Sequence, residues 1–89
     1  MADEQDSLPQ IDFSTFVMSL SHSALVHLGD APDVDGKAEP QLDLARQTID
    51  ILGLLHDKTK GNLSGEEERL LSQALVDLRL RFVEVSRGT

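Results

Sequence analysis

Residues 13–29 contain no charged side chain, although 27% of the residues in the whole chain are charged. Apolar, hydroxyl and histidine side chains, with one terminal glycine, occupy all 17 positions between Asp12 and Asp30. A helix that avoids charge on every side usually has no side in open water. This segment therefore predicts a helix that is buried on more sides than a monomer of 89 residues easily provides.

The size of the chain limits how it can be stabilised. Eighty-nine residues make one small domain, and the absence of cysteine removes disulfides and thiolate metal sites as stabilising devices. The three aromatic residues are all phenylalanine, so the core has to be mainly aliphatic. Small domains without such devices often gain stability by oligomerising.

The net charge of −8 is unevenly distributed. Residues 1–12 carry −4 and residues 30–40 carry −3, whereas the rest of the chain is almost balanced. Nucleic acid is an unsuitable partner, because phosphate binding requires clustered lysine and arginine. The acidic first residues also lack the basic start and apolar stretch of a secretory segment.

The uncharged run does not predict a membrane span. Seventeen residues are at the lower limit for crossing a bilayer, and this run contains five hydroxyl side chains and two histidines with acids on both flanks. We expect a cytoplasmic protein with no membrane contact.

Local signals predict three helices. Residues 1–11 are polar and acidic, with a proline at position 9, and are expected to form a disordered tail. Asp12 is a suitable N-cap for a helix over residues 12–28, and Gly29 suits its C-terminal cap. These features place one helical domain over residues 12–86.

Two further helices follow the acidic loop of residues 30–40. The second is expected over residues 40–59 with Pro40 in its first turn. The third is expected over residues 65–86, because Ser64 and Glu67 have the spacing of a capping box. Residues 87–89 are left as a short tail.

Apolar residues occupy more than one side of these helices. In the first helix one face holds Phe13, Phe16, Val17, Leu20, Ala24 and Leu28, and in the third the main row is Leu71, Leu75, Leu78, Phe82 and Val85. Packing within one three-helix subunit covers one set of apolar faces and leaves a second set without a neighbour. We therefore predict an all-α three-helix bundle completed by self-association, as a homodimer by symmetry or as a higher oligomer. The predicted interface residues are Met18, His22, Leu25, Val26, Val76, Leu80 and Val83.

Several segments resemble a small bacterial family catalogued as domain of unknown function 1844. The similarity lies in residues 13–29, in Ala-Arg-Gln-Thr-Ile-Asp-Ile-Leu-Gly-Leu-Leu at 45–55, and in residues 58–64, 66–71 and 78–85. It covers about residues 12–85. The resemblance implies a helical bacterial protein, and it supplies no activity and no functional residues.

The histidines do not form a recognisable site in the sequence. His22 and His27 are five residues apart, which places them about 140° apart around a helix, whereas paired ligands on one helix sit three or four residues apart. His56 lies elsewhere. A calcium loop aligned on Gly36 fails, because Ala31 and Leu42 would occupy ligand positions. We predict no metal, no cofactor and no catalytic set.

One polar cluster and one acidic segment leave other functions open. Lys58, Lys60 and Asn62 could contact an anion, although they follow the C-terminus of a helix, where lysine simply complements the helix dipole. The leading interpretation is a small helical interaction module that self-associates. The first alternative is a ligand-binding or catalytic protein with a polar pocket near His22, His27 or the loop from Lys58 to Asn62. The second is a regulator whose acidic tail binds a basic protein.

Overall fold

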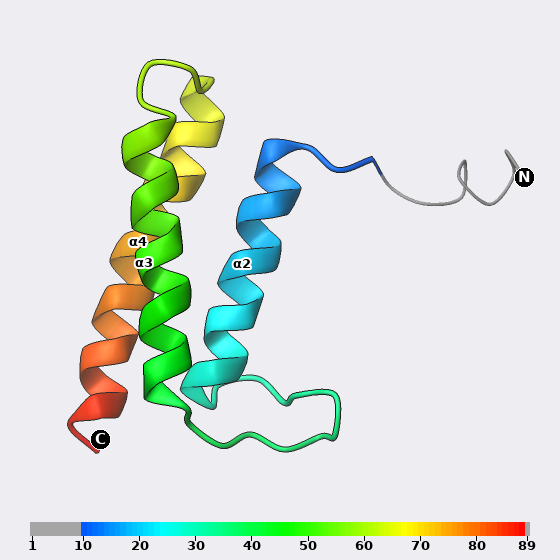
Figure 1. Ribbon diagram of the computed structural model, residues 1–89, viewed down its shortest axis with the longest axis vertical. Helices are drawn as coiled ribbons and strands as arrows, with labels where there is room; N and C mark the ends of the chain where they lie inside the picture. Colours follow the sequence, from blue (N-terminus) through cyan, green and yellow to red (C-terminus); the bar gives the residue numbers. More distant parts are fainter. Residues whose placement is uncertain (1–9, 89) are drawn as a thin grey trace, which may run out of the picture.

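The computed structural model describes residues 10–88, and helices are the only regular elements in that range. The helices are α2 (Phe13–Leu28), α3 (Leu42–Lys58) and α4 (Gly65–Ser86). Figure 1 shows α3 and α4 as an antiparallel pair joined by a short loop, with α2 beside them and the longer α2–α3 loop at the opposite end. These bounds differ from the predicted ranges by two residues or fewer. Most of the expected acidic tail, residues 1–9, lies outside the described part.

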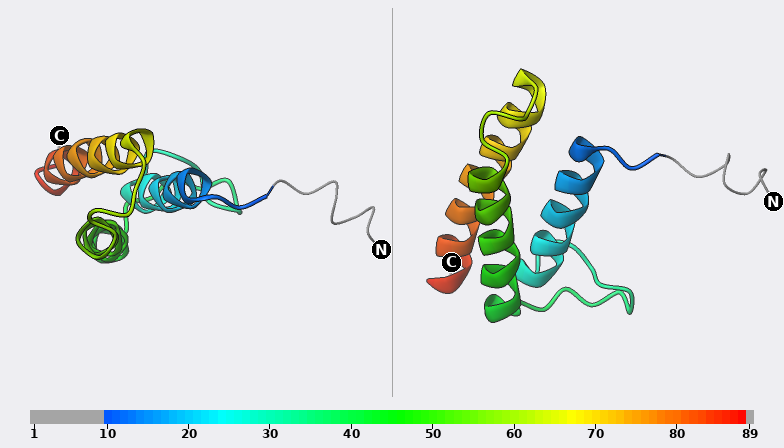
Figure 2. Two further views of the ribbon diagram at one scale, coloured as in Figure 1. Left: turned by 90° about the horizontal axis from the view of Figure 1, so that it is seen from above. Right: turned by 45° about the horizontal axis from the view of Figure 1, so that its top comes forward.

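The three helices form one bundle, and each helix packs against both of the others. Seen from above, they stand at the corners of a triangle (Figure 2). The predicted all-α three-helix fold is therefore confirmed. None of the helices within residues 10–88 combines the length and the apolar character needed to cross a bilayer.

The predicted caps are confirmed at three helix ends. The Asp12 carboxylate accepts a hydrogen bond of 2.8 Å from the backbone N–H of Thr15, and this bond lowers the pKa of Asp12. Ser64 and Glu67 form a reciprocal capping box, with bonds of 3.1 and 2.8 Å. Gly29 ends α2 in the left-handed conformation at φ 84°. Each signal acts within four residues, which is why the sequence reveals it.

Pro40 lies outside α3, which corrects the prediction that it occupies the first helical turn. The helix begins at Leu42, and the N-cap is Gln41. The backbone N–H of Gln41 donates a hydrogen bond of 2.6 Å to the carbonyl of His27, which draws this segment against the end of α2. The Pro40 ring then comes so close to Gly29 that a Cβ at that glycine would be 3.2 Å from the proline nitrogen.

The core is aliphatic and draws on all three helices. The buried apolar residues are Val17, Ala24, Leu28, Ala45, Ile49, Leu52, Leu71, Leu75 and Leu78. One polar side chain, Thr48, is buried with them, and its hydroxyl donates a hydrogen bond of 3.1 Å to the carbonyl of Leu44. The buried hydroxyl is therefore satisfied within its own helix.

The buried side of α2 is turned slightly from the predicted one. Leu25 is half-buried and packs against the core, whereas Phe16, expected on the core face, is 41% exposed. A helical wheel identifies apolar positions but does not determine how the helix rotates against two neighbours at once. Leu25 therefore serves the core of its own subunit.

An ion pair joins the end of α2 to α4. Arg81 donates two hydrogen bonds to the Asp30 carboxylate, from Nε to Oδ2 at 2.7 Å and from Nη2 to Oδ1 at 2.8 Å. These hydrogen bonds hold the pKa of Asp30 below its usual value, and they raise the pKa of Arg81 together with a bond to Glu84. The contact links residues 51 positions apart in the chain.

Replacing Leu52 with alanine should destabilise the subunit far more than replacing Leu44. Leu52 is fully buried, and its truncation leaves a cavity, at a cost of about 2–5 kcal/mol. Leu44 is 39% exposed, so Leu44→Ala should cost less than about 1.5 kcal/mol. Urea unfolding followed by circular dichroism measures both. Equal losses would contradict the core described above.

Replacing Asp30 with asparagine should lower the melting temperature at neutral pH but have little effect in strong acid. The pKa of Asp30 is lower in the folded protein than its usual value of 3.8, so the ionised form stabilises the fold above that pH. This stabilisation is lost as the pH falls through the lowered folded value. Thermal melts from pH 7 to pH 2 test the change. Asp35→Asn, which removes one charge from the same loop, is the control and should show a smaller difference at pH 7.

Candidate functional site

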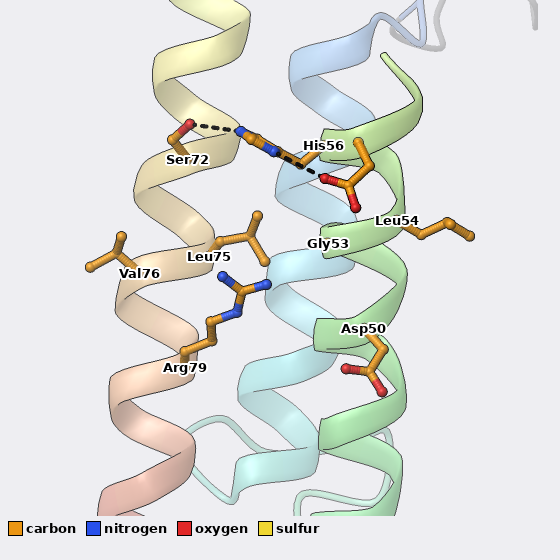
Figure 3. A pocket seen from close by; sticks show the side chains of 9 residues that line it. Asp50, Gly53, Leu54, His56, Ser72, Leu75, Val76 and Arg79 are labelled. Carbon is orange, nitrogen blue, oxygen red and sulfur yellow. Dashed lines mark hydrogen bonds and ion pairs between the residues drawn. The ribbon is translucent and has the colours of Figure 1, made fainter. Parts of the chain in front are cut away.

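A groove runs between α3 and α4 on the side of this pair that faces away from α2. Its larger hollow, of about 560 Å³, is lined by Asp50, Gly53, Leu54, His56, Asp57, Ser72, Leu75, Val76 and Arg79. A second hollow continues from it and shares Asp50 and Arg79. Figure 3 looks into the groove, with α2 behind the two helices that form its walls. We call this feature the α3–α4 groove.

Arg79 lies across the α3–α4 groove. Its guanidinium projects from α4 toward α3 (Figure 3), and a Cβ at Gly53 would be only 3.1 Å from its Nη2 atom. Glycine inside a helix is less favourable than alanine. At position 53 the missing side chain leaves room for the arginine to lie against α3. No ion pair within the described residues involves Arg79, which leaves its charge available to a partner.

A serine, a histidine and an aspartate meet at one end of this groove. The Ser72 hydroxyl is 3.4 Å from Nε2 of His56, and Nδ1 of His56 is 3.8 Å from a carboxylate oxygen of Asp57 (Figure 3). The sequence did not reveal this cluster, because only the antiparallel pairing of α3 and α4 brings residues 56 and 72 together.

The order of these groups resembles a hydrolytic triad, but the surroundings do not suit one. Ser72 lies inside α4, where the backbone N–H groups are engaged in the helix and cannot form an oxyanion hole. Both distances are also long for strong hydrogen bonds. The cluster is best described as a weak polar link between two helices.

Exposed apolar side chains lie in and beside the α3–α4 groove: Leu54, Val76 and Val83 line its hollows, whereas Leu80 lines neither. Val76 and Leu80 are 60% exposed and Val83 is 41% exposed, and their spacing of four and three residues places them in one row along α4. We call these three residues the α4 row. Leu54, on the α3 rim, is 58% exposed. All three α4 positions that the sequence assigned to an interface therefore lie on the surface of the subunit.

The side of α2 away from the core carries the other expected interface residues except Leu25, which packs against the core. Met18 is 61% exposed, and His22 is exposed beside it in a shallow hollow that also includes Thr15 and Ser19. Val26 is half-buried and lines a second hollow with residues 32–34 of the following loop. We call the side of α2 that carries these five side chains the outer face of α2. It bears no charge.

The remaining polar candidates are dispersed. Lys58, Lys60 and Asn62 are exposed around the connection between α3 and α4. Nδ1 of His27 is buried and has no hydrogen-bond partner among the described residues. No group of three metal-ligating side chains comes together within residues 10–88.

Comparison with known proteins gives one match. The sequence model of the family described as "Domain of unknown function (DUF1844)" matches residues 10–84. No curated protein and no solved structure matches the chain.

Replacing Gly53 with alanine should stabilise the subunit. Alanine is favoured over glycine in a helix interior by about 0.8–1 kcal/mol, and outside α3 the added Cβ would meet, among the described residues, only the end of a flexible, exposed arginine. Urea unfolding measures the gain, and the same change made in an Arg79→Ala background provides the comparison. If Gly53→Ala destabilises the unchanged protein but not the Arg79→Ala protein, Arg79 is held rigidly against α3.

Proposed function

The chain belongs to the DUF1844 family, a domain of unknown function, and we propose that it is a helical interaction module that self-associates. The α4 row carries this proposal. Single exposed apolar residues are common on protein surfaces, but a contiguous exposed row is typical of an interaction site. The spacing of the row also matches one seam of a coiled coil.

The energetics favour covering the α4 row. Removing a valine or leucine side chain fully from water is worth about 1.5–3 kcal/mol. Val76, Leu80 and Val83 are already partly covered, so each would contribute only part of this free energy. Leu54 on α3 and Met18 on α2 are further apolar side chains that would gain from being covered, at 58% and 61% exposed.

The composition of α2 supports the same proposal. A helix that faced water on its outer side would normally carry charged residues there, and this one carries none over its 16 residues. The outer face of α2 combines Met18 with short hydroxyl side chains, a mixture that tolerates close contact with another helix.

A small-molecule pocket has less support. Ligand sites usually enclose most of the surface of their ligand, whereas the α3–α4 groove is open along its length and its walls mix isolated charges with exposed apolar residues. The polar groups beside His22 also lie in a shallow surface hollow. These features suit an elongated protein surface better than a small ligand.

Replacing Leu80 with glutamate should dissociate the assembly without unfolding the subunit. Leu80 is exposed in the isolated subunit, so the charge is harmless there, but it would be costly once buried in an interface. Light scattering should give at least twice the subunit mass of 9.8 kDa for the unchanged protein and 9.8 kDa for Leu80→Glu. Circular dichroism should show the same helix content for both.

Ile51→Glu is the matched control for this measurement. Ile51 is 40% exposed on α3 and lies about 160° around that helix from Gly53, so it points away from the groove. This variant should keep the oligomeric mass. If the unchanged protein has the mass of a single subunit at every concentration, the proposal is wrong.

A further inference from the structure

We infer that two copies pair through α4 in parallel, with the α4 row of each packed on that of the other and Arg79 of each bound to Glu84 of the other. This inference rests on the proposed self-association and names the contact that produces it. Its basis is the heptad positions of the residues around the α4 row and the charges that they carry.

The α4 row is part of a longer line of exposed positions on α4. Five exposed residues follow one another at intervals of three, four, three and four positions: Gln73, Val76, Leu80, Val83 and Arg87. These intervals are those of alternating a and d positions in a heptad, with a at residues 73, 80 and 87 and d at residues 76 and 83. The buried Leu71 and Leu78 fall at position f, on the opposite side of the helix. The line therefore points away from the core of the subunit.

The positions that flank the α4 row carry complementary side chains. On one flank, position g holds Ser72 and Arg79, and on the other, position e holds Asp77 and Glu84. When two helices pair in parallel and in register, each g residue faces the e residue five positions later in the other copy. Arg79 then faces Glu84 and Ser72 faces Asp77, and the two-fold symmetry makes each contact twice.

Both members of the charged contact are accessible in the isolated subunit. Arg79 is exposed and takes part in no ion pair within residues 10–88. Its guanidinium lies toward Gly53 of α3, so the side chain has to turn toward the α4 row when a second copy binds. The Glu84 side chain is 47% exposed and accepts a hydrogen bond of 3.2 Å from Arg81. A carboxylate accepts several hydrogen bonds, so Glu84 can bind Arg79 of the second copy and keep Arg81.

Antiparallel pairing of the same helices gives an unfavourable arrangement of charge. It brings e positions to e positions and g positions to g positions. The flank that carries Asp77 and Glu84 then meets the same acidic flank of the second copy, and the flank with Arg79 meets its own equivalent. Like charges placed opposite each other across an interface are unfavourable. The flanking residues therefore select the parallel direction.

The ends of the line carry arginines together with acids. Parallel pairing places Arg69, at the preceding d position, and Arg87 opposite their own copies. Glu66 and Glu84 lie three residues before them on the same helix, so each arginine has an acid one turn away. Arg87 also stands at the C-terminal end of α4, where the helix dipole favours a cation. The facing arginines are therefore offset locally.

The groove beside Arg79 also contains charges from α3. Asp50 and Asp57 line its larger hollow, and Arg46 lines its continuation. With Arg79 this edge holds two acids and two bases, so its net charge does not decide the pairing. Because the line points away from the core, a helix packed on it meets α4 before α3. Arg79 is the charge of this edge that lies on α4 itself, next to the α4 row.

The flanking charges also indicate two strands rather than more. Leucine at a with isoleucine at d favours three or four strands, and the Leu80 and valine pattern here resembles it. A larger coiled coil would cover the flanks as well, and burying Asp77, Arg79 and Glu84 away from water would be costly. A two-stranded contact leaves these three side chains at its rim. We therefore assign one second copy to this surface.

Introduced cysteines report the direction of pairing, because the chain contains none of its own. Gln73→Cys and Arg87→Cys place single thiols at two a positions that are about 21 Å apart along α4. Parallel pairing brings each thiol opposite its own copy, so both variants should form a covalent dimer with oxidised glutathione. Antiparallel pairing centred on the α4 row separates both pairs by at least about 15 Å, beyond the reach of a disulfide.

Ile51→Cys is the matched control, since it places a thiol on the side of α3 that points away from the groove. It should form little covalent dimer, and circular dichroism should show the same helix content for all three variants. If neither α4 variant exceeds this control while the unchanged protein is a dimer by light scattering, the inference is overturned and self-association stands. A covalent dimer at only one of the two α4 positions contradicts pairing in register. A monomeric unchanged protein overturns both the inference and the proposed function.

Exchanging the two charges tests the contact between Arg79 and Glu84. Arg79→Glu and Glu84→Arg should each weaken the dimer about tenfold, because like charges then face each other twice. The double variant that carries both changes should regain most of the lost affinity. Lys58→Glu changes the net charge as Arg79→Glu does but lies at the end of α3, and it should have little effect. Analytical ultracentrifugation over a range of concentrations measures the dissociation constants.

The sign of the Glu84→Arg effect distinguishes the two directions of pairing. In an antiparallel dimer this change would place an arginine near Asp77 of the second copy and would strengthen the association. A stronger dimer for Glu84→Arg therefore overturns the parallel arrangement. A double variant that is no tighter than the two single variants would show that Arg79 and Glu84 do not meet, which also overturns it.

Discussion

Three helices packed in a triangle can cover only the sides of each helix that face the other two. In this protein that limit determines which apolar side chains are buried and which stay exposed. The core takes leucine, isoleucine, valine and alanine from all three helices and holds them without any aromatic residue among the buried set. Among the other apolar side chains of the helices, Met18, Leu54, Val76 and Leu80 remain more than half exposed.

Two arginines of α4 make different contacts, one inside the subunit and one in the α3–α4 groove. Arg81 forms a bidentate ion pair with Asp30 and joins the end of α2 to α4 inside the subunit. Arg79, two residues earlier, points to the other side of α4 and lies over Gly53 without an ion-pair partner among the described residues. One arginine thus secures the subunit, whereas the side chain of the other remains exposed in the groove.

The polar cluster of Ser72, His56 and Asp57 illustrates why residue types alone do not establish chemistry. The three groups stand in the order of a hydrolytic triad, yet the helix that carries the serine supplies no free backbone donors for a developing oxyanion. Sequence spacing gave no sign of this cluster, because its members come from two helices whose pairing depends on the whole bundle. The ion pair between Asp30 and Arg81 could not be predicted from the sequence for the same reason.

The sequence by itself determined the three helices, their ends and the uncharged character of α2. Asp12, Gly29, Ser64 and Glu67 act on backbone groups a few residues away, so their effects can be derived without a fold. Only the tertiary structure decided that Leu25 enters the core while Phe16 stays partly exposed, that Pro40 stands outside α3, and that the groove and the outer face of α2 lie on opposite sides. These features depend on how each helix is rotated and placed against two others, and that arrangement follows from the packing of all the side chains together.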